Sequence, residues 1–142
     1  MNFTELNTKE FDSTFSLLEE SKLDSSDLKQ PNVRLFSLND NDKLVGVGGL
    51  EIMGSVALLR SVAVKPDVRG KGIGKELVAQ IEQVAKHSGI KALYLLTNTA
   101  ANFFQTIGYQ RIERNSFAES LKRTAQFTGL CPVSAVCMIK EI

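Results

Sequence analysis

The residues best suited to chemistry in this 142-residue chain form one glycine-spaced basic loop, Arg69-Gly70-Lys71-Gly72-Ile73-Gly74-Lys75. Glycines at alternate positions let the backbone approach a ligand closely, so that successive amide groups can point at one anion. An amphipathic helix is expected to begin within this loop, and its first N–H groups and positive dipole end also favour an anion. Lys71 and Lys75 add positive charge. The loop is therefore predicted to cradle a pyrophosphate group.

Two nucleotide-binding motifs do not fit the spacing of this loop. The dinucleotide motif G-x-G-x-x-G would need a third glycine where the chain has Lys75, after Gly70 and Gly72. The Walker motif needs Ser or Thr after Gly-Lys, and Glu76 stands there instead. A strand-to-helix turn without a ligand is the remaining alternative. It is the weaker interpretation, because an arginine, three glycines, two lysines and a helix start coincide.

The loop and its flanks resemble the GNAT N-acetyltransferase superfamily. Arg69–Gly74 is similar to the family's acyl-CoA loop, whose pattern is Arg/Gln-x-x-Gly-x-Gly/Ala. The preceding Val62-Ala63-Val64 resembles the family's cofactor strand, and Phe103–Tyr109 resembles the end of a helix in the family pattern. The resemblance covers nearly the whole chain.

Three segments resemble a narrower group, a bacterial subgroup associated with arsenic-resistance operons. They are Leu50–Val64, Leu93–Arg111 and Leu130–Met138. Within the second of them, Leu95–Tyr109 is also similar to amino-acid N-acetyltransferases such as N-acetylglutamate synthase. The resemblance therefore implies an amino acid or a related compound as the acceptor.

The superfamily resemblance implies an α+β fold, acetyl-CoA as cofactor and a set of cofactor contacts. The implied sheet is mixed and mostly antiparallel, with six or seven strands, flanking helices and a splayed parallel pair that opens a slot for the pantetheine arm. The implied contacts are the main chain of Val62, Ala63 and Val64 for pantetheine; Arg69, Gly70, Lys71, Gly72, Ile73, Gly74 and Lys75 for the pyrophosphate; Thr97 or Asn98 for pantetheine; and Phe103 and Phe104 beside the thioester.

Acetyl transfer to an amine needs a base for the ammonium proton, and Glu51 is the best candidate. It is the lone carboxylate in a long apolar stretch, on the strand next to the cofactor strand. The alternative is a carboxylate that faces solvent or pairs with Arg60. Arg60 could itself hold a substrate carboxylate through two hydrogen bonds, or simply pair with Glu51.

One residue departs from the family pattern. Phe104 stands where many members place a tyrosine that acts as general acid, and phenylalanine cannot donate a proton. Either the thiolate leaves unaided, which a thiol pKa of about 8.5 makes tolerable, or another group supplies the proton. Tyr94 and Cys131 are possible substitutes, although Cys131 is more simply a buried small side chain.

The predicted function is an acetyl-CoA-dependent N-acetyltransferase that moves an acetyl group to the primary amine of a small molecule, an amino acid or an amino-acid-like compound. Two alternatives stay open. The first is a protein or peptide N-acetyltransferase. The second is a catalytically weak acyl-CoA-binding module, which the phenylalanine at position 104 motivates.

The elements that must position these residues follow from hydrophobic periodicity and turn residues. The predicted strands are Asn2–Leu6, Val33–Leu38, Lys43–Ile52, Val56–Val64, Ile90–Thr97, Tyr109–Glu113 and Ser134–Ile139. The predicted helices are Thr8–Ser21, a short turn at Ser25–Leu28, the helix from the glycine loop to Gly89, Thr99–Ile107 and Phe117–Thr128. Short loops predict an antiparallel meander over 33–64, and the helix after the glycine loop predicts that Ile90–Thr97 runs parallel to Val56–Val64. Gly48 and its neighbours inside a strand predict a bulge or a closely approaching ligand.

Composition places the chain among ordinary single-domain proteins, with 43% hydrophobic and 23% charged residues. The net charge of +1 and the lack of like-charge blocks give no argument for nucleic acid. No membrane span, signal pattern or metal-binding spacing is apparent, and two cysteines are too few for a disulfide framework. One cytoplasmic domain covering 1–142 is predicted, with a possible homodimer through the last strand.

Overall fold

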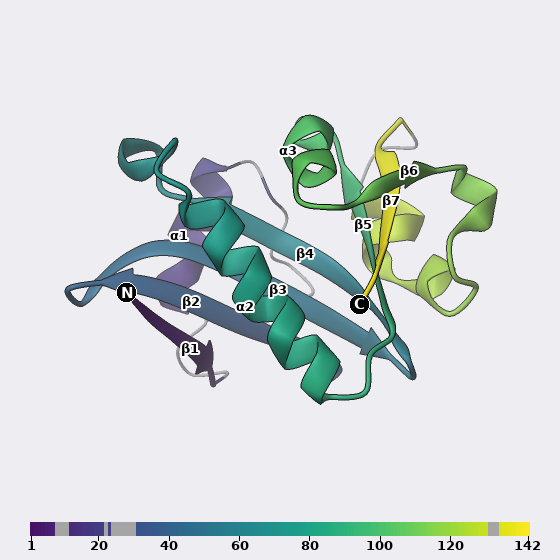
Figure 1. The fold of residues 1–142 in the computed structure, drawn as a ribbon, viewed down its shortest axis with the longest axis horizontal. Helices are drawn as coiled ribbons and strands as arrows, with labels where there is room; N and C mark the ends of the chain where they lie inside the picture. Colours follow the sequence, from purple (N-terminus) through teal and green to yellow (C-terminus); the bar gives the residue numbers. More distant parts are fainter. Residues whose placement is uncertain (8–11, 22, 24–30, 131–133) are drawn as a thin grey trace.

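A seven-stranded mixed sheet organises the chain (Figure 1). The fold comes from a computed structural model, which describes residues 1–7, 12–21, 23, 31–130 and 134–142. The strands are β1 (Asn2–Leu6), β2 (Val33–Asp40), β3 (Lys43–Met53), β4 (Val56–Val64), β5 (Ala92–Thr97), β6 (Gln110–Ile112) and β7 (Val136–Glu141). The α-helices are α1 (Asp12–Glu20), α2 (Ile73–His87) and α3 (Ala101–Thr106). The strand order in the sheet is β1-β2-β3-β4-β5-β7-β6.

β2, β3 and β4 form the predicted antiparallel meander, because tight turns connect them. β1 pairs antiparallel with the outer edge of β2. The crossover through α2 makes β5 parallel to β4, which confirms that prediction. β7 then pairs antiparallel with β5 on its other side and with β6. The expected mixed, mostly antiparallel sheet with one parallel pair is confirmed.

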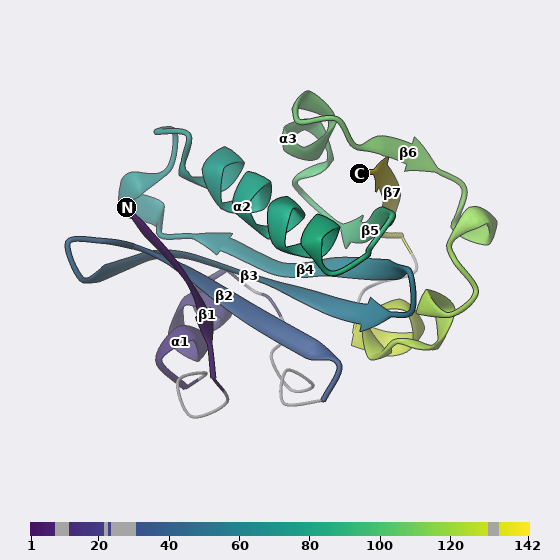
Figure 2. The same cartoon turned by 60° about the horizontal axis from the view of Figure 1, so that its bottom comes forward.

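Helices cover both faces of the sheet (Figure 2). On one face, Leu77 and Ile81 of α2 are fully buried in a core cluster with Leu50 of β3 and Leu59 of β4. On the other face, α1 contributes Leu17 and Leu18 to a smaller buried cluster with strand residues of β2, β3 and β4. None of the helices formed by the described residues is long and apolar enough to cross a membrane.

The glycines of β3 make room for α2 against the sheet. A Cβ at Gly48 would lie 2.6 Å from Ile81 Cδ1, and one at Gly46 would lie 3.3 Å from Leu77 Cδ2. A Cβ at either position would therefore crowd the Ile81 or Leu77 side chain that packs on the strand. The expectation of a closely approaching ligand at Gly48 is therefore replaced by a closely packed helix, while the expected bulge does lie beside it.

The region 114–130 differs most from its prediction. A single helix over Phe117–Thr128 is wrong: the chain forms short 3₁₀ turns at Arg114–Ser116 and Leu121–Arg123 and a π-helical turn at Gln126–Leu130. Thr124 explains the break, because its hydroxyl donates to the Leu121 carbonyl at 2.7 Å and accepts from the Phe127 N–H at 3.3 Å.

Element boundaries elsewhere shift by a few residues. β7 begins two residues later than predicted and ends two residues later. β6 is three residues long, against the five that were predicted. The start of the first helix and the predicted turn at Ser25–Leu28 lie outside the described residues.

Candidate functional site

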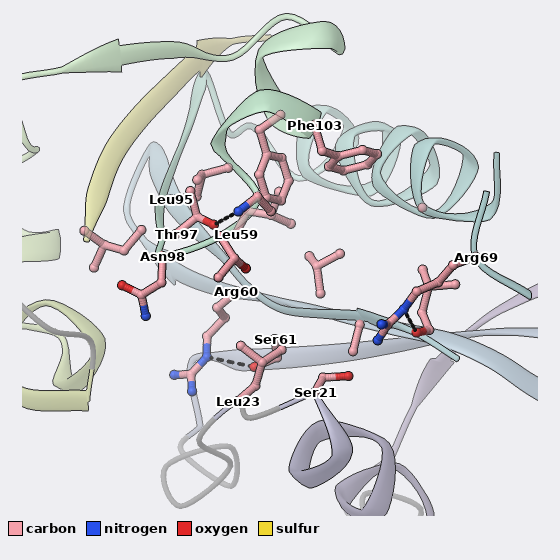
Figure 3. A pocket seen from close by; sticks show the side chains of 18 of the residues that line it. Ser21, Leu23, Leu59, Arg60, Ser61, Arg69, Leu95, Thr97, Asn98 and Phe103 are labelled. Carbon is pink, nitrogen blue, oxygen red and sulfur yellow. Dashed lines mark hydrogen bonds between the residues drawn. The ribbon is translucent and has the colours of Figure 1, made fainter. Parts of the chain in front are cut away.

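β4 and β5 separate along their length and open a slot in the sheet. Their parallel pairing covers three positions and ends with Leu58 opposite Tyr94. Beyond that pair β4 continues to Val64 while β5 continues to Thr97 in pairing with β7 only. A cleft of about 900 Å³ occupies this divergence (Figure 3). The splayed parallel pair expected from the sequence is therefore present.

A bulge in β4 sets which side chains face each side of the slot. The β3–β4 register shifts between Val47 and Gly49, and Ser61 on β4 has a positive φ of 59°. Past the bulge, Val62 and Val64 pack on the core cluster under α2, whereas Ala63 packs with the cluster under α1. The bulge thus reverses the alternation of the strand exactly where the two strands diverge.

The glycine loop and the start of α2 line one end of the cleft. Of Arg69–Lys75, every residue except the exposed Lys71 contributes to the described lining. Gly70 and Gly72 have φ values of 84° and 78°, a left-handed backbone that residues with a Cβ rarely adopt. A Cβ at Gly74 would crowd the Phe103 ring, because it would lie 3.2 Å from Phe103 Cζ.

The start of α2 borders the cleft with amides that have no partner within the helix. α2 begins at Ile73 after Gly72, so the first amides of the helix have no partner one turn earlier in the helix. Arg69 lines the cleft, and its Nε donates to the Val64 carbonyl oxygen at 2.9 Å. That bond ties the loop to the end of β4, as Figure 3 shows.

The opposite wall comes from β5 and α3. Thr97 and Asn98 line the cleft, and Thr97 Oγ1 accepts a hydrogen bond from the Ala100 N–H at 3.0 Å. Phe103 and Phe104 also line it, with ring centroids 5.0 Å apart in an edge-to-face arrangement. Thr97 therefore fixes the turn that leads into α3, while the two rings form an apolar wall.

A buried network outside the cleft braces that wall. Phe104 is 6% exposed and packs edge-to-face on Tyr109, with ring centroids 5.5 Å apart. The Tyr109 hydroxyl donates to Glu82 Oε2 at 2.8 Å, and Lys140 Nζ donates to the same carboxylate at 3.0 and 3.1 Å. Burial, followed by the nearby Glu82 carboxylate, raises the pKa of Tyr109 far above its usual value. The network joins α2 to β7 behind the α3 wall.

Glu51 and Arg60 form a buried ion pair on the face of the sheet away from α2. Arg60 Nη1 lies 3.1 Å from Glu51 Oε1, with side chains that are 1% and 8% exposed respectively. Arg60 Nε also donates to Ser61 Oγ at 3.3 Å. Arg60 lines the cleft, and Glu51 is not part of the described lining. The pairing that was an alternative for both residues is therefore present.

Several cleft residues were not anticipated from the sequence. The end of α1 and its continuation contribute Glu20, Ser21 and Leu23, and the other unanticipated lining residues are Leu58, Leu59, Ser61, Leu95, Leu96, Thr99, Ala100 and Gln126. The leucines belong to predicted strands, so their burial could be expected, but no motif marks the α1 residues.

The two proposed substitutes for a general acid are not placed at the cleft by the described structure. Tyr94 packs edge-to-face on Phe117, with ring centroids 5.1 Å apart, and it is not part of the described lining. Cys131 lies outside the described residues.

Comparisons with known proteins find similarity to acetyltransferases. The sequence profile of the "Acetyltransferase (GNAT) family" matches residues 2–109. An uncharacterized N-acetyltransferase of Chlorobaculum tepidum is 34% identical over 82 residues, 58% of this chain and 50% of that protein. An amino-acid acetyltransferase of Ectopseudomonas mendocina is 42% identical over 52 residues, 37% of this chain and 12% of that protein.

Among solved structures, N-acetylglutamate synthase from Neisseria gonorrhoeae, complexed with coenzyme A and L-arginine, superposes with a TM-score of 0.82. The match covers 99% of this chain and 33% of that protein, at 16% identity, so it speaks for the fold alone. The matches with these three proteins span at most half of each of them.

Proposed function

Because the chain belongs to the GNAT acetyltransferase family, whose cosubstrate is acetyl-CoA, we propose that residues 1–142 form one acetyltransferase unit that moves the acetyl group of acetyl-CoA to the primary amine of a small molecule. An amino acid or an amino-acid-like compound is the proposed acceptor. The observation that carries the proposal is the slot between β4 and β5, which runs from the free amides of the α2 start to the last paired residues, Leu58 and Tyr94.

The slot suits the long, jointed shape of acetyl-CoA. The amides of Gly72–Lys75 offer hydrogen bonds and a helix dipole to a pyrophosphate. The stretch Leu59–Val64 has no β5 partner, so an extended pantetheine arm can pair with its main chain as an added strand would. Six residues of strand span roughly 20 Å, which leaves the thioester near the point of divergence, beside Leu59, Leu95 and Phe104.

The reaction requires the ammonium group of the acceptor to lose one proton, so that its nitrogen can attack the thioester carbonyl. The nitrogen loses a second proton as the amide forms, and the departing coenzyme A thiolate can take up that proton through solvent. The C–N bond of the amide forms as the C–S bond breaks. Arg60 is the proposed contact for an acceptor carboxylate, because it is the cation that lines the described cleft on the α1 side. An anion that binds Arg60 would share the guanidinium with Glu51, which is the proposed base for the ammonium proton.

Two alternatives bear on the same cleft. A catalytically weak acyl-CoA-binding module is favoured by one observation: Phe104, which has no proton to donate, lies in the lining where many family members carry tyrosine. Protein or peptide acetylation is the other alternative, and an open cleft does not discriminate against it.

One assay separates these functions. Release of free thiol from acetyl-CoA is followed with a panel of L-amino acids, simple amines and short peptides, and acetyl-CoA binding is measured by calorimetry. Amine-dependent thiol release with amino acids supports the proposal. Tight binding of acetyl-CoA without release for any amine would favour the binding module, and activity confined to peptides would favour the second alternative.

A further inference from the structure

One polar atom of the cleft is left unsatisfied. Ser21 follows α1 and lines the cleft, and its Oγ is buried without a hydrogen-bond partner among the described residues. No other side-chain nitrogen or oxygen within the described part of the chain is in this condition. Buried hydroxyls are nearly always paired, because an unpaired one loses its bonds to water and gains none in return.

Ser21 lies on the acceptor side of the cleft. Figure 3 shows it with Leu23, Arg60 and Ser61 on the side nearer α1, across the cleft from Thr97 and Phe103. The thioester is proposed to lie between these two sides, near Leu59 and Leu95. An amine that reaches the thioester therefore extends its remaining groups toward Ser21.

We propose that the Ser21 hydroxyl donates a hydrogen bond to an oxygen atom at the end of the acceptor remote from its amine, the carboxylate in the case of an amino acid. This inference rests on the proposed function and adds a specificity-determining residue to it. Donation follows from the charges nearby: the neighbouring Arg60 guanidinium draws an anionic oxygen to this side of the cleft, and a carboxylate can only accept.

The test compares Ser21→Ala with Ser16→Ala, which removes an exposed hydroxyl from α1, the helix that Ser21 follows. Each is assayed with L-amino acids and with the amines that correspond to them without the carboxylate. Ser21→Ala should lower kcat/KM for the amino acids about tenfold, through a higher acceptor KM, because a bond to a charged group is lost. It should leave kcat/KM for the plain amines and the acetyl-CoA KM close to wild type, and it should not lower the thermal midpoint, because the hydroxyl has no hydrogen bond to lose. Ser16→Ala should change none of these quantities.

The outcomes separate the two proposals. If the wild type acetylates amino acids and Ser21→Ala does so with the same kcat/KM, the proposed role of Ser21 is overturned and the proposed function stands. An equal loss of kcat/KM for plain amines and for amino acids would also overturn this role, since the hydroxyl would then not discriminate acceptors by their carboxylate. If the wild type turns over no amine, calorimetric titration of the same compounds into the coenzyme A complex decides. Tighter amino-acid binding by the wild type than by Ser21→Ala supports the contact, and equal or absent binding overturns it.

Discussion

Arg60 pairs with Glu51 at 3.1 Å and also lines the cleft, whereas Glu51 is not part of the described lining. If Arg60 binds the carboxylate of the acceptor, as proposed, the guanidinium is shared between that carboxylate and Glu51. Under this proposal the binding of the acceptor would change the surroundings of the proposed base.

Glu51→Gln is expected to lower turnover by a factor of about 10² or more while acetyl-CoA affinity stays near wild type, because general-base catalysis typically contributes this much. The variant also leaves Arg60 buried beside a neutral amide, so the free energy of unfolding should fall by a few kcal/mol. Steady-state kinetics across the alkaline range, calorimetry with acetyl-CoA and urea unfolding measure these effects.

The matched control for that variant is Glu82→Gln, which removes the charge of a partly buried ion pair with Lys140 outside the described cleft lining. It should cost stability without lowering turnover to the same degree. Wild-type turnover in Glu51→Gln at every pH would eliminate Glu51 as the base and leave it the role of holding Arg60.

Gly72→Ala should weaken acetyl-CoA binding, and Gly54→Ala should not. Both glycines have positive φ, 78° and 69°, and at both a Cβ would meet nothing within 4 Å. Each substitution should therefore cost about 1–2 kcal/mol of stability through backbone strain alone. Only Gly72 belongs to the proposed cradle, so calorimetry should find weaker acetyl-CoA binding in that variant only.

A stronger form of the same test places negative charge in the cradle. Gly72→Glu and Gly74→Glu should abolish acetyl-CoA binding, because the carboxylate repels the pyrophosphate and, at Gly74, the side chain also collides with Phe103. Unchanged affinity in either glutamate variant would defeat the assignment of the loop to the cofactor.

Tyr94→Phe should keep wild-type kcat. The Tyr94 ring packs on Phe117 and is not part of the described cleft lining, so we expect the thiolate to leave without a proton from it. Loss of a general acid would lower kcat by about 10² to 10⁴-fold, so a drop of that size would identify Tyr94 as the missing donor. Phe104→Tyr, measured beside it, should raise kcat only modestly if departure of the thiolate does not limit the rate.

Tyr109 should make the protein less stable at alkaline pH. Its pKa in the folded state is raised far above the unfolded value of about 10. The contribution of Tyr109 is therefore complete below pH 10, and stability falls above it by about 1.4 kcal/mol per pH unit, because only the unfolded chain releases the proton. The chain has two tyrosines and no tryptophan, so in Tyr94→Phe the tyrosinate absorbance reports Tyr109 alone. That absorbance should rise together with unfolding; a rise in folded protein would contradict the prediction.

The parts of the fold that follow local rules could be predicted from the sequence. β4 has the predicted bounds, because the turn at Gly54 precedes the strand and Pro66, which has no N–H for a further ladder bond, follows its end. The glycine loop could be predicted for a similar reason, since the positive φ values at positions 70 and 72 favour glycine, and glycine is visible in the sequence. The resemblance to a family then supplied the cofactor that the loop alone did not specify.

The proposed acceptor side could not be predicted in the same way. The bulge was predicted from Gly48 on β3, but the positive φ of Ser61 on the opposite strand was not, because it depends on the register between β3 and β4. Ser21 and Gln126 reach the cleft from segments far apart in the sequence, and their burial depends on tertiary packing rather than on periodicity. The π-helical turn at Gln126–Leu130 likewise depends on side-chain bonds of Thr124 that no hydrophobic pattern records.

The divergence of β4 and β5 has a further consequence for how the protein behaves before it meets its cofactor. A strand edge without a partner is a template on which another extended chain can add, and proteins usually protect such edges. Here the edge lies in the interior of the sheet order, and Arg69 occupies the Val64 carbonyl at its far end. A bound pantetheine arm would cover the remainder, so the cofactor would also serve as protection against self-association. Light scattering during storage should accordingly rise more slowly with coenzyme A present than without it.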